Sequence, residues 1–167
     1  KGGIVFADAV TTVSNTYADE IKTPFYGEGL DGLLRARSNS LRGIVNGIDY
    51  TDFNPETDRN LTACYNAATF RKEKVKNKIQ LQRDLGLEED PKAMMIGIVS
   101  RLTDQKGFDL IAYIMDELCQ DSVQIVALGT GDERYENMFR HFDWKYHGKV
   151  SAQIYYDESM SHRIYAA

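Results

Sequence analysis

This sequence is poor in cysteine, and its two cysteines offer no chemistry as a pair. Cys64 and Cys119 lie far apart, and neither belongs to a CxxC motif. The three histidines, His141, His147 and His162, have no spacing typical of a metal site, and we expect His162 at the surface or in a helix cap. We therefore predict reduced thiols in a cytoplasmic protein, with no metal centre and no cofactor.

Long apolar runs and an excess of basic residues are also missing. No run approaches the roughly 20 apolar residues of a membrane span, and no signal-peptide pattern opens the chain. The 20 lysines and arginines are outnumbered by 25 aspartates and glutamates, which gives a net charge of −5. A nucleic-acid surface normally presents a basic face, so nucleic acid is not expected as a partner. The basic run RKEKVKNK (71–78) is better interpreted as a solvated helix face.

Several motifs of well-known enzyme classes are absent. There is no GxxxxGK[ST] loop and no GxSxG elbow, which argues against a P-loop nucleotidase and a Ser-His-Asp hydrolase. GTGD (129–132) begins like a dinucleotide fingerprint, but Arg134 stands where the third glycine would be. Two interpretations of GTGD stay open: close backbone approach to a ligand at Gly129 and Gly131, or a tight turn that caps a helix through Asp132.

The first 58 residues consist of short apolar segments separated by glycine-rich loops. The polar segment DYTDFNPETD (49–58) contains Pro55, lacks periodicity and is interpreted as a connector between two bodies. Before it we expect a strand at 9–14, a helix capped by Ser14 or Asn15 that runs to Ile21, a short helix within 27–38 and a strand at 41–45.

From residue 60 onward, apolar segments of strand length alternate with helical segments. Continuously apolar strands, each followed by a helix, are typical of a parallel sheet that is covered on both faces. We therefore predict an α/β fold with a Rossmann-like parallel sheet, of the doubly wound nucleotide-binding type. The expected helices are 69–85, 108–118, 133–142 and 158–167, and the expected strands are 94–99, 123–128 and 150–155.

Both ends of the sequence are unusual. The first residue is Lys1 rather than Met, and the last three residues fall inside a predicted helix. Three predicted strands are also fewer than the roughly five or six of an average sheet. We expect an unfinished sheet and a chain that is an excerpt from a larger protein.

The segment SRLTDQKG (100–107) joins a predicted strand to a predicted helix and carries two cations, Arg101 and Lys106. At such a junction, unpaired backbone N–H groups and the positive end of the helix dipole favour an anion. Arg101 can bind two phosphate oxygens at once, and Lys106 adds a compact charge. The segment predicts a diphosphate site, and the alternative is a surface turn with incidental charges.

Ligands of open parallel sheets bind beyond the carboxyl ends of the strands. Three loops follow those ends here, namely SRLTDQKG, GTGD and the turn at Tyr155-Tyr156-Asp157. Their convergence predicts one crevice in which Gly129 and Gly131 bind substrate by close backbone approach. Tyr156 could stack there on a base or sugar, although an isolated aromatic of this kind more often packs against the protein.

Four segments of the chain together resemble one family. YGEGLDGLLRARS (26–38), NGIDYTDFNPETD (46–58), SRLTDQKGFDL (100–110) and LGTGDERYE (128–136) strongly resemble bacterial glycogen synthases and plant starch synthases. The resemblance covers essentially the whole chain and implies a partial GT-B architecture, in which two Rossmann-like domains face a cleft. It assigns residues 1–48 to the C-terminal part of the N-terminal, acceptor-side domain, 49–59 to the connector and 60–167 to the first part of the nucleotide-sugar-binding domain.

By the same resemblance, the full-length parent transfers glucose from ADP-glucose to the non-reducing end of an α-1,4-glucan with retention of configuration. Arg101 and Lys106 would bind the donor diphosphate as catalytic residues, Asn46 would approach the glucosyl unit and Tyr156 would face the adenine. The excerpt alone is expected to be inactive. The sequence departs from the family at Phe53, where Trp is usual, and it carries Tyr155 in place of a glycine near the nucleotide.

Two alternatives remain open on the sequence. One is another retaining GT-B transferase that uses a different sugar nucleotide, against which GTGDERYE and NGIDYTDFNP count. The other is a non-catalytic nucleotide-binding module.

Overall fold

A computed structural model describes all 167 residues, which divide into two compact units, Lys1–Asp49 and Tyr50–Ala167. Residues 50–59, for which we predicted a connector, are grouped with the second unit. The assignment of either unit to a particular domain of a larger protein stays a prediction.

The second unit is built on a three-stranded parallel sheet with the order β3-β4-β5. Strand β4 is central, and Ile125 pairs with Ile96 on one side and with Val150 on the other. The strands are β3 (Met94–Val99), β4 (Val123–Leu128) and β5 (Val150–Gln153).

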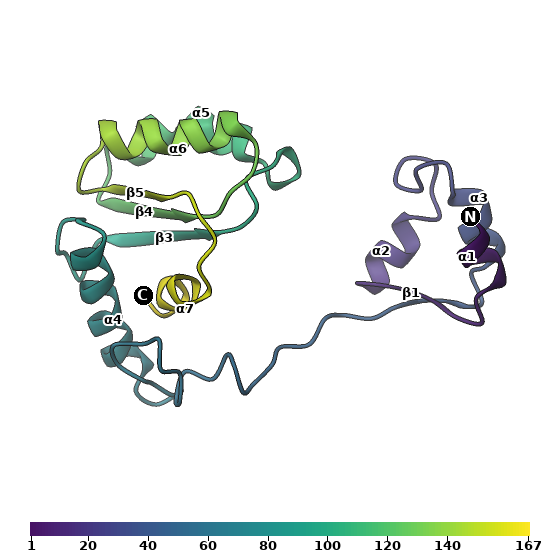
Figure 1. Ribbon diagram of the computed structural model, residues 1–167, viewed down its shortest axis with the longest axis horizontal. Helices are drawn as coiled ribbons and strands as arrows, with labels where there is room; N and C mark the ends of the chain where they lie inside the picture. The colour runs from purple at the N-terminus through teal and green to yellow at the C-terminus, as the bar shows by residue number, and fades with distance from the viewer. The chain divides into compact units, whose positions relative to one another are not determined.

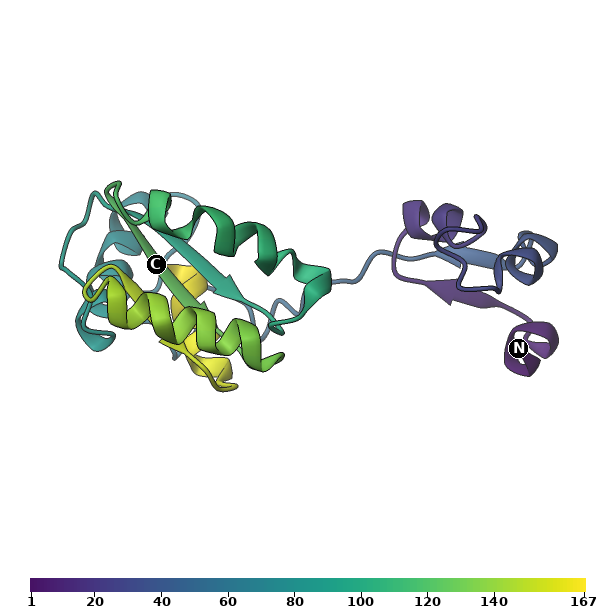
Figure 2. The same cartoon turned by 90° about the horizontal axis from the view of Figure 1, so that it is seen from above.

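Helices cover both faces of this sheet, as Figure 1 shows. Along β4, Ile125 and Ala127 pack toward α5 and α6, whereas Val126 and Leu128 pack toward α4 and α7. Figure 2 shows α5 and α6 lying together over one face. The helices are α4 (Phe70–Asp84), α5 (Phe108–Leu118), α6 (Glu133–Lys145) and α7 (Glu158–Ala166). The predicted parallel α/β sheet with helices on both faces is confirmed.

The first unit is smaller, with two parallel strands and a core of four buried side chains. Ser14 provides the N-cap of α2, because its hydroxyl accepts a hydrogen bond from the Tyr17 backbone N–H at 2.9 Å. The elements are α1 (Gly2–Phe6), β1 (Val10–Thr12), α2 (Asn15–Glu20), α3 (Asp31–Ala36) and β2 (Leu41–Gly43).

Three strands are shorter than the sequence predicts: β1 covers Val10–Thr12 rather than 9–14, and β2 and β5 end early for one physical reason. Strand β2 ends at Gly43 and β5 ends at Gln153, because the last paired residues of their partner strands are Thr12 and Leu128. Apolar character continues beyond both ends, but a strand requires a partner for its backbone groups.

Three further differences concern helices. The helix predicted at 133–142 continues to Lys145, and the ion pair of Lys145 with Asp116 of α5 supports its last turn. Helix α1 and the short 3-10 helix η1 (Asp104–Lys106) were not predicted. None of the helices has the length and apolar character needed to cross a bilayer.

Candidate functional site

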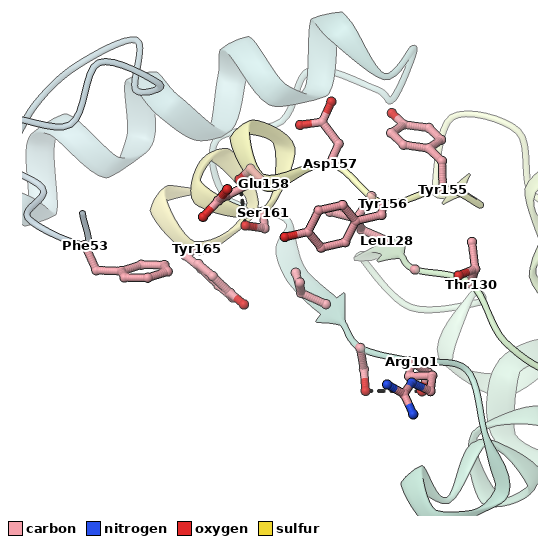
Figure 3. Close-up of a pocket in the computed structure, with 13 residues that line it drawn as sticks. Phe53, Arg101, Leu128, Thr130, Tyr155, Tyr156, Asp157, Glu158, Ser161 and Tyr165 are labelled. Atoms are coloured by element: carbon pink, nitrogen blue, oxygen red, sulfur yellow. Dashed lines mark hydrogen bonds between the residues drawn. The ribbon is translucent and has the colours of Figure 1, made fainter. Parts of the chain in front are cut away.

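A large cavity of the second unit lies at the carboxyl ends of its three strands. Its volume is about 470 Å³. Figure 3 shows Arg101 on one side of this cavity and Phe53 and Tyr165 on the other, with the Tyr156 ring between them. The lining residues come from all three predicted loops, from helix α7 and from the segment near Phe53; they are Phe53, Val99, Ser100, Arg101, Leu128, Gly129, Thr130, Tyr155, Tyr156, Asp157, Glu158, Ser161 and Tyr165.

A second cavity of about 300 Å³ adjoins it and contains both cations of the β3–α5 loop. Arg101 lines both cavities, and Lys106 lines the second together with Ser100, Thr103 and Gln105. The loop reaches α5 through η1 and then through Gly107, whose φ of 71° is the left-handed conformation that glycine favours. This path places the two cations on a shared concavity.

The β3–α5 loop also contains an acid, but its charge is directed away from the cations. The Asp104 carboxylate pairs with Arg134 and accepts a hydrogen bond from the Tyr135 hydroxyl at 2.6 Å. Arg101 and Lys106 are exposed and form no ion pair in the structure. Their charges are therefore available to an anion.

The β3–α5 and β4–α6 loops are joined through their backbones. The Leu102 N–H donates to the Thr130 carbonyl at 2.9 Å, and the Asp132 N–H donates to the Leu102 carbonyl at 2.7 Å. A Cβ at Gly129 would lie 1.9 Å from the Ser100 carbonyl oxygen, and one at Gly131 would lie 2.1 Å from that of Leu102. Only glycine allows the two loops to approach this closely.

The amide groups of both glycines already have partners within the protein. The Gly129 N–H donates to the Gln153 carbonyl at 3.1 Å, and the Gly131 N–H donates to the Glu136 carboxylate at 3.0 Å. This bond from Gly131 lowers the pKa of Glu136. Asp132 occupies the N-cap position of α6, as the turn interpretation expects, and its side chain makes no capping hydrogen bond.

The aromatic side chains after β5 have different roles. Tyr156 is 86% exposed, which excludes the interpretation that it packs in the protein interior. The neighbouring Tyr155 donates its hydroxyl to the Gln153 side chain at 2.7 Å, and Figure 3 shows its ring directed away from that of Tyr156. Asp157 caps α7 by accepting a hydrogen bond from the Met160 N–H. Tyr156 is thus the residue of this turn that is free to stack on a ligand.

The structure does not bring all predicted site residues to this cavity. Gly131 supports the β4–α6 loop but does not line either cavity. Asn46 lies in the first unit, exposed, in the segment after β2. No cluster of three or more His, Cys, Asp or Glu side chains is arranged to hold a metal ion.

Comparison with known proteins finds relatives along the whole chain. The family described as the starch synthase catalytic domain matches residues 1–36. The chain is 71% identical to the glycogen synthase of Lachnospira eligens and 56% identical to that of Clostridium acetobutylicum, over 100% of this chain and 35% of each relative. Over its whole length, the chain is similar to glycogen synthases.

The chain is also similar to a solved structure of a starch synthase. The catalytic domain of starch synthase IV from Arabidopsis thaliana, bound to ADP and acarbose, matches with a TM-score of 0.91 and 38% identity. The match covers 99% of this chain and 34% of that chain. The chain spans about a third of the length of the curated relatives it matches.

Sequence reasoning missed two parts of this candidate site. Phe53 and Tyr165 line the large cavity, although neither was a candidate. His162 was expected at the surface or in a cap, and that prediction is wrong, because its side chain is only 5% exposed and contacts Asp58. The two partners are 104 residues apart, so no local pattern could pair them.

Proposed function

We propose that the complete protein transfers glucose from ADP-glucose to the non-reducing end of an α-1,4-glucan with retention of anomeric configuration. Similarity to glycogen synthases over the whole chain supports the reaction. Similarity to a starch synthase that was solved with ADP and acarbose supports the nucleotide and the glucan. The activity is assigned to the complete protein because this chain spans about a third of its relatives.

The observation that carries the proposal is the shared concavity of Arg101 and Lys106, both without an acidic partner. When the bond between the anomeric carbon and the donor oxygen breaks, its electron pair stays on the phosphate oxygen of ADP. Fixed cations at that oxygen stabilise the transition state more than the ground state. Arg101 would bind two oxygens of the diphosphate, and Lys106 would add the second charge.

The other predicted residues complete this proposed site. Tyr156 would face the adenine, with its exposed ring available for stacking. Gly129 would line the site and Gly131 would support it through close loop packing, and their amides would not contact the ligand, since both are already paired. Asn46 would approach the glucosyl unit from the first unit.

The domain assignment is part of the same proposal. Residues 1–48 would belong to the acceptor-side domain of a GT-B enzyme, and residues 49–59 would connect it to the nucleotide-sugar domain that begins at residue 60. The parallel sheet of the second unit, with its cavity at the carboxyl ends of the strands, supports a nucleotide-sugar role for that domain.

The test measures incorporation of radiolabelled glucose into glycogen by the protein expressed from its complete coding sequence. We expect incorporation from ADP-glucose that excess unlabelled ADP-glucose suppresses and excess UDP-glucose does not. The Arg101→Ala variant should lose nearly all incorporation while keeping its thermal unfolding midpoint. Absence of incorporation, or equal competition by UDP-glucose, would contradict the assigned reaction or donor.

A further inference from the structure

Phe53 lies at the boundary between two cavities of the second unit. Its ring lines the large cavity of about 470 Å³ and also a small one of about 70 Å³. The ring is 44% exposed, so one part faces open space while the rest is supported. Figure 3 shows it beside Tyr165, on the side of the large cavity opposite Arg101.

The support for this ring is a histidine of helix α7. The rings of Phe53 and His162 are stacked, with centroids 4.6 Å apart and planes inclined by 19°. Phe53 belongs to a segment with no helix or strand, so no regular backbone structure fixes its side chain. The orientation of the His162 ring therefore determines the orientation of the Phe53 ring.

The orientation of His162 is fixed in turn by a buried carboxylate. The His162 Nδ1 lies 2.6 Å from the Asp58 Oδ2, and the two side chains are 5% and 7% exposed. Asp58 also accepts hydrogen bonds from the backbone N–H and the side-chain amide of Asn60, at 2.8 and 2.9 Å. These bonds hold the carboxylate, which leaves the imidazole one direction in which to point.

A buried polar pair is a costly way to gain stability, because both groups lose their hydration. An apolar side chain at position 162 would pack against Phe53 equally well but would not define the angle of a ring. The arrangement is better suited to orientation than to stability. The ring that it orients is the one that lines the large cavity.

We propose that Phe53 contacts the nucleoside end of the donor and that the Asp58–His162 pair positions its ring for that contact. This inference rests on the proposed function, because it takes the large cavity as the nucleotide site. The diphosphate would lie near Arg101, and the apolar planar nucleobase would lie between Tyr156 and Phe53. His162 and Asp58 touch no substrate and are positioning residues.

The kinetic test uses the protein expressed from its complete coding sequence and compares Phe53→Ala with His162→Asn. The asparagine amide can still donate to Asp58, but it offers no ring to Phe53. We expect each variant to raise the KM for ADP-glucose about three- to ten-fold, with kcat changed less than two-fold, as a lost stacking contact predicts. The double variant should be no worse than Phe53→Ala alone, because both changes remove the same contact.

Ile164→Val is the matched control, since Ile164 is a buried residue of the same helix and lines neither cavity. It should lower the unfolding midpoint and leave the KM unchanged. A normal KM in Phe53→Ala and His162→Asn, in an enzyme that Arg101→Ala inactivates, would overturn this inference and leave the proposed function intact. Additive effects in the double variant would also overturn it. Lack of ADP-glucose turnover by the unmodified protein would overturn both.

A fluorescence measurement tests the position of the ring directly. Trp144 is the only tryptophan and is largely exposed, so Trp144→Phe with Phe53→Trp places a single reporter at the cavity wall. Saturating ADP should shift or quench its emission, and the additional His162→Asn change should abolish at least half of that response. An ADP response that is absent, or that is unaffected by His162→Asn, would contradict the proposal.

Discussion

The two loops that follow β3 and β4 lie side by side at the carboxyl edge of the sheet, yet they are built for different tasks. In the β3–α5 loop, Arg101 and Lys106 are exposed and unpaired, and the one acid between them is bound elsewhere. In the β4–α6 loop, the amides of Gly129 and Gly131 already donate to groups of the protein.

The difference shows that a glycine-rich loop beside a ligand cavity need not bind the ligand with its backbone. Gly129 and Gly131 are required because the carbonyls of Ser100 and Leu102 occupy the space of a side chain. The β4–α6 loop is a support, and the β3–α5 loop presents the charges. The predictions below test this division of roles.

The largest effect is expected from the β3–α5 loop, which carries Arg101 and Lys106. Lys106→Ala in the complete protein should lower kcat about 100- to 1,000-fold, the range found when one preorganised donor to a developing negative charge is removed. The unfolding midpoint should not change, because Lys106 is exposed and makes no ion pair. Steady-state kinetics with ADP-glucose, together with thermal unfolding, measure both quantities.

Lys72→Ala is the control for this change, since Lys72 is an exposed lysine of α4 that lines none of the cavities. It should leave kcat and KM unaltered. Near-normal turnover of Lys106→Ala would remove Lys106 from the proposed transition-state role and with it the division between the loops.

A substitution in the β4–α6 loop should first lower the stability of the protein. Gly131→Ala places a Cβ 2.1 Å from the Leu102 carbonyl oxygen, so one of the two loops must move. We expect the free energy of unfolding to fall by roughly 1–3 kcal/mol, as is typical of overpacking, and the affinity for ADP to fall with it. Chemical denaturation measures the first effect and calorimetric titration the second.

Gly32→Ala is the comparison variant, because Gly32 lies in a helix and a Cβ there would meet only the Arg35 side chain, at an ordinary contact distance of 3.8 Å. It should be neutral or slightly stabilising, since alanine favours a helix over glycine. If Gly131→Ala kept full stability but lost ADP binding, Gly131 would be a ligand contact rather than a support.

Much of the fold follows from the sequence because each element is defined locally. The strands Met94–Val99 and Val123–Leu128 and the helix Phe108–Leu118 have the predicted bounds, since apolar runs and amphipathic helices carry their own periodicity. The ends of β2 and β5 were misplaced, because a partner strand elsewhere in the chain determines where they stop.

The candidate site shows the same difference between features defined locally and features defined by distant residues. The sequence predicts that Arg101, Lys106 and Tyr156 lie at one edge of the sheet, and they line its cavities, because parallel strands bring their carboxyl ends together. Phe53 and His162 were missed because their relation is set by Asp58, which is far from His162 in sequence. A buried hydrogen bond between distant residues leaves no periodic signal.

A smaller effect tests how the Asp104 carboxylate of the β3–α5 loop is kept away from the ligand. Arg134→Ala should release the Asp104 carboxylate and weaken ADP binding up to about five-fold, consistent with the roughly 0.2–1 kcal/mol of an exposed ion pair. Adding Asp104→Asn removes the released charge and should restore the affinity. Calorimetric titration at low and high salt measures both variants, and an affinity that Asp104→Asn fails to restore would show that Arg134 acts by another route.

The smallest effect concerns Glu136, whose carboxylate accepts the hydrogen bond from the Gly131 N–H in the β4–α6 loop. The hydrogen bond from the Gly131 N–H lowers the pKa of Glu136 below its usual 4.5, and Arg140 acts in the same direction while burial opposes it. A carboxylate whose pKa is lower in the folded state than in the unfolded state stabilises the folded protein at pH values above its unfolded-state pKa. This contribution is lost as the pH falls through the folded-state pKa. The stability difference between the unmodified protein and Glu136→Gln should therefore shrink as the pH is lowered from 7 to about 3.

Denaturant unfolding across this pH range measures the difference in the free energy of unfolding. Glu133→Gln is the control, because the Glu133 carboxylate makes no ion pair. A difference that stays constant with pH would mean that the Gly131 amide does not depend on this carboxylate, and the loop would then be open to a ligand.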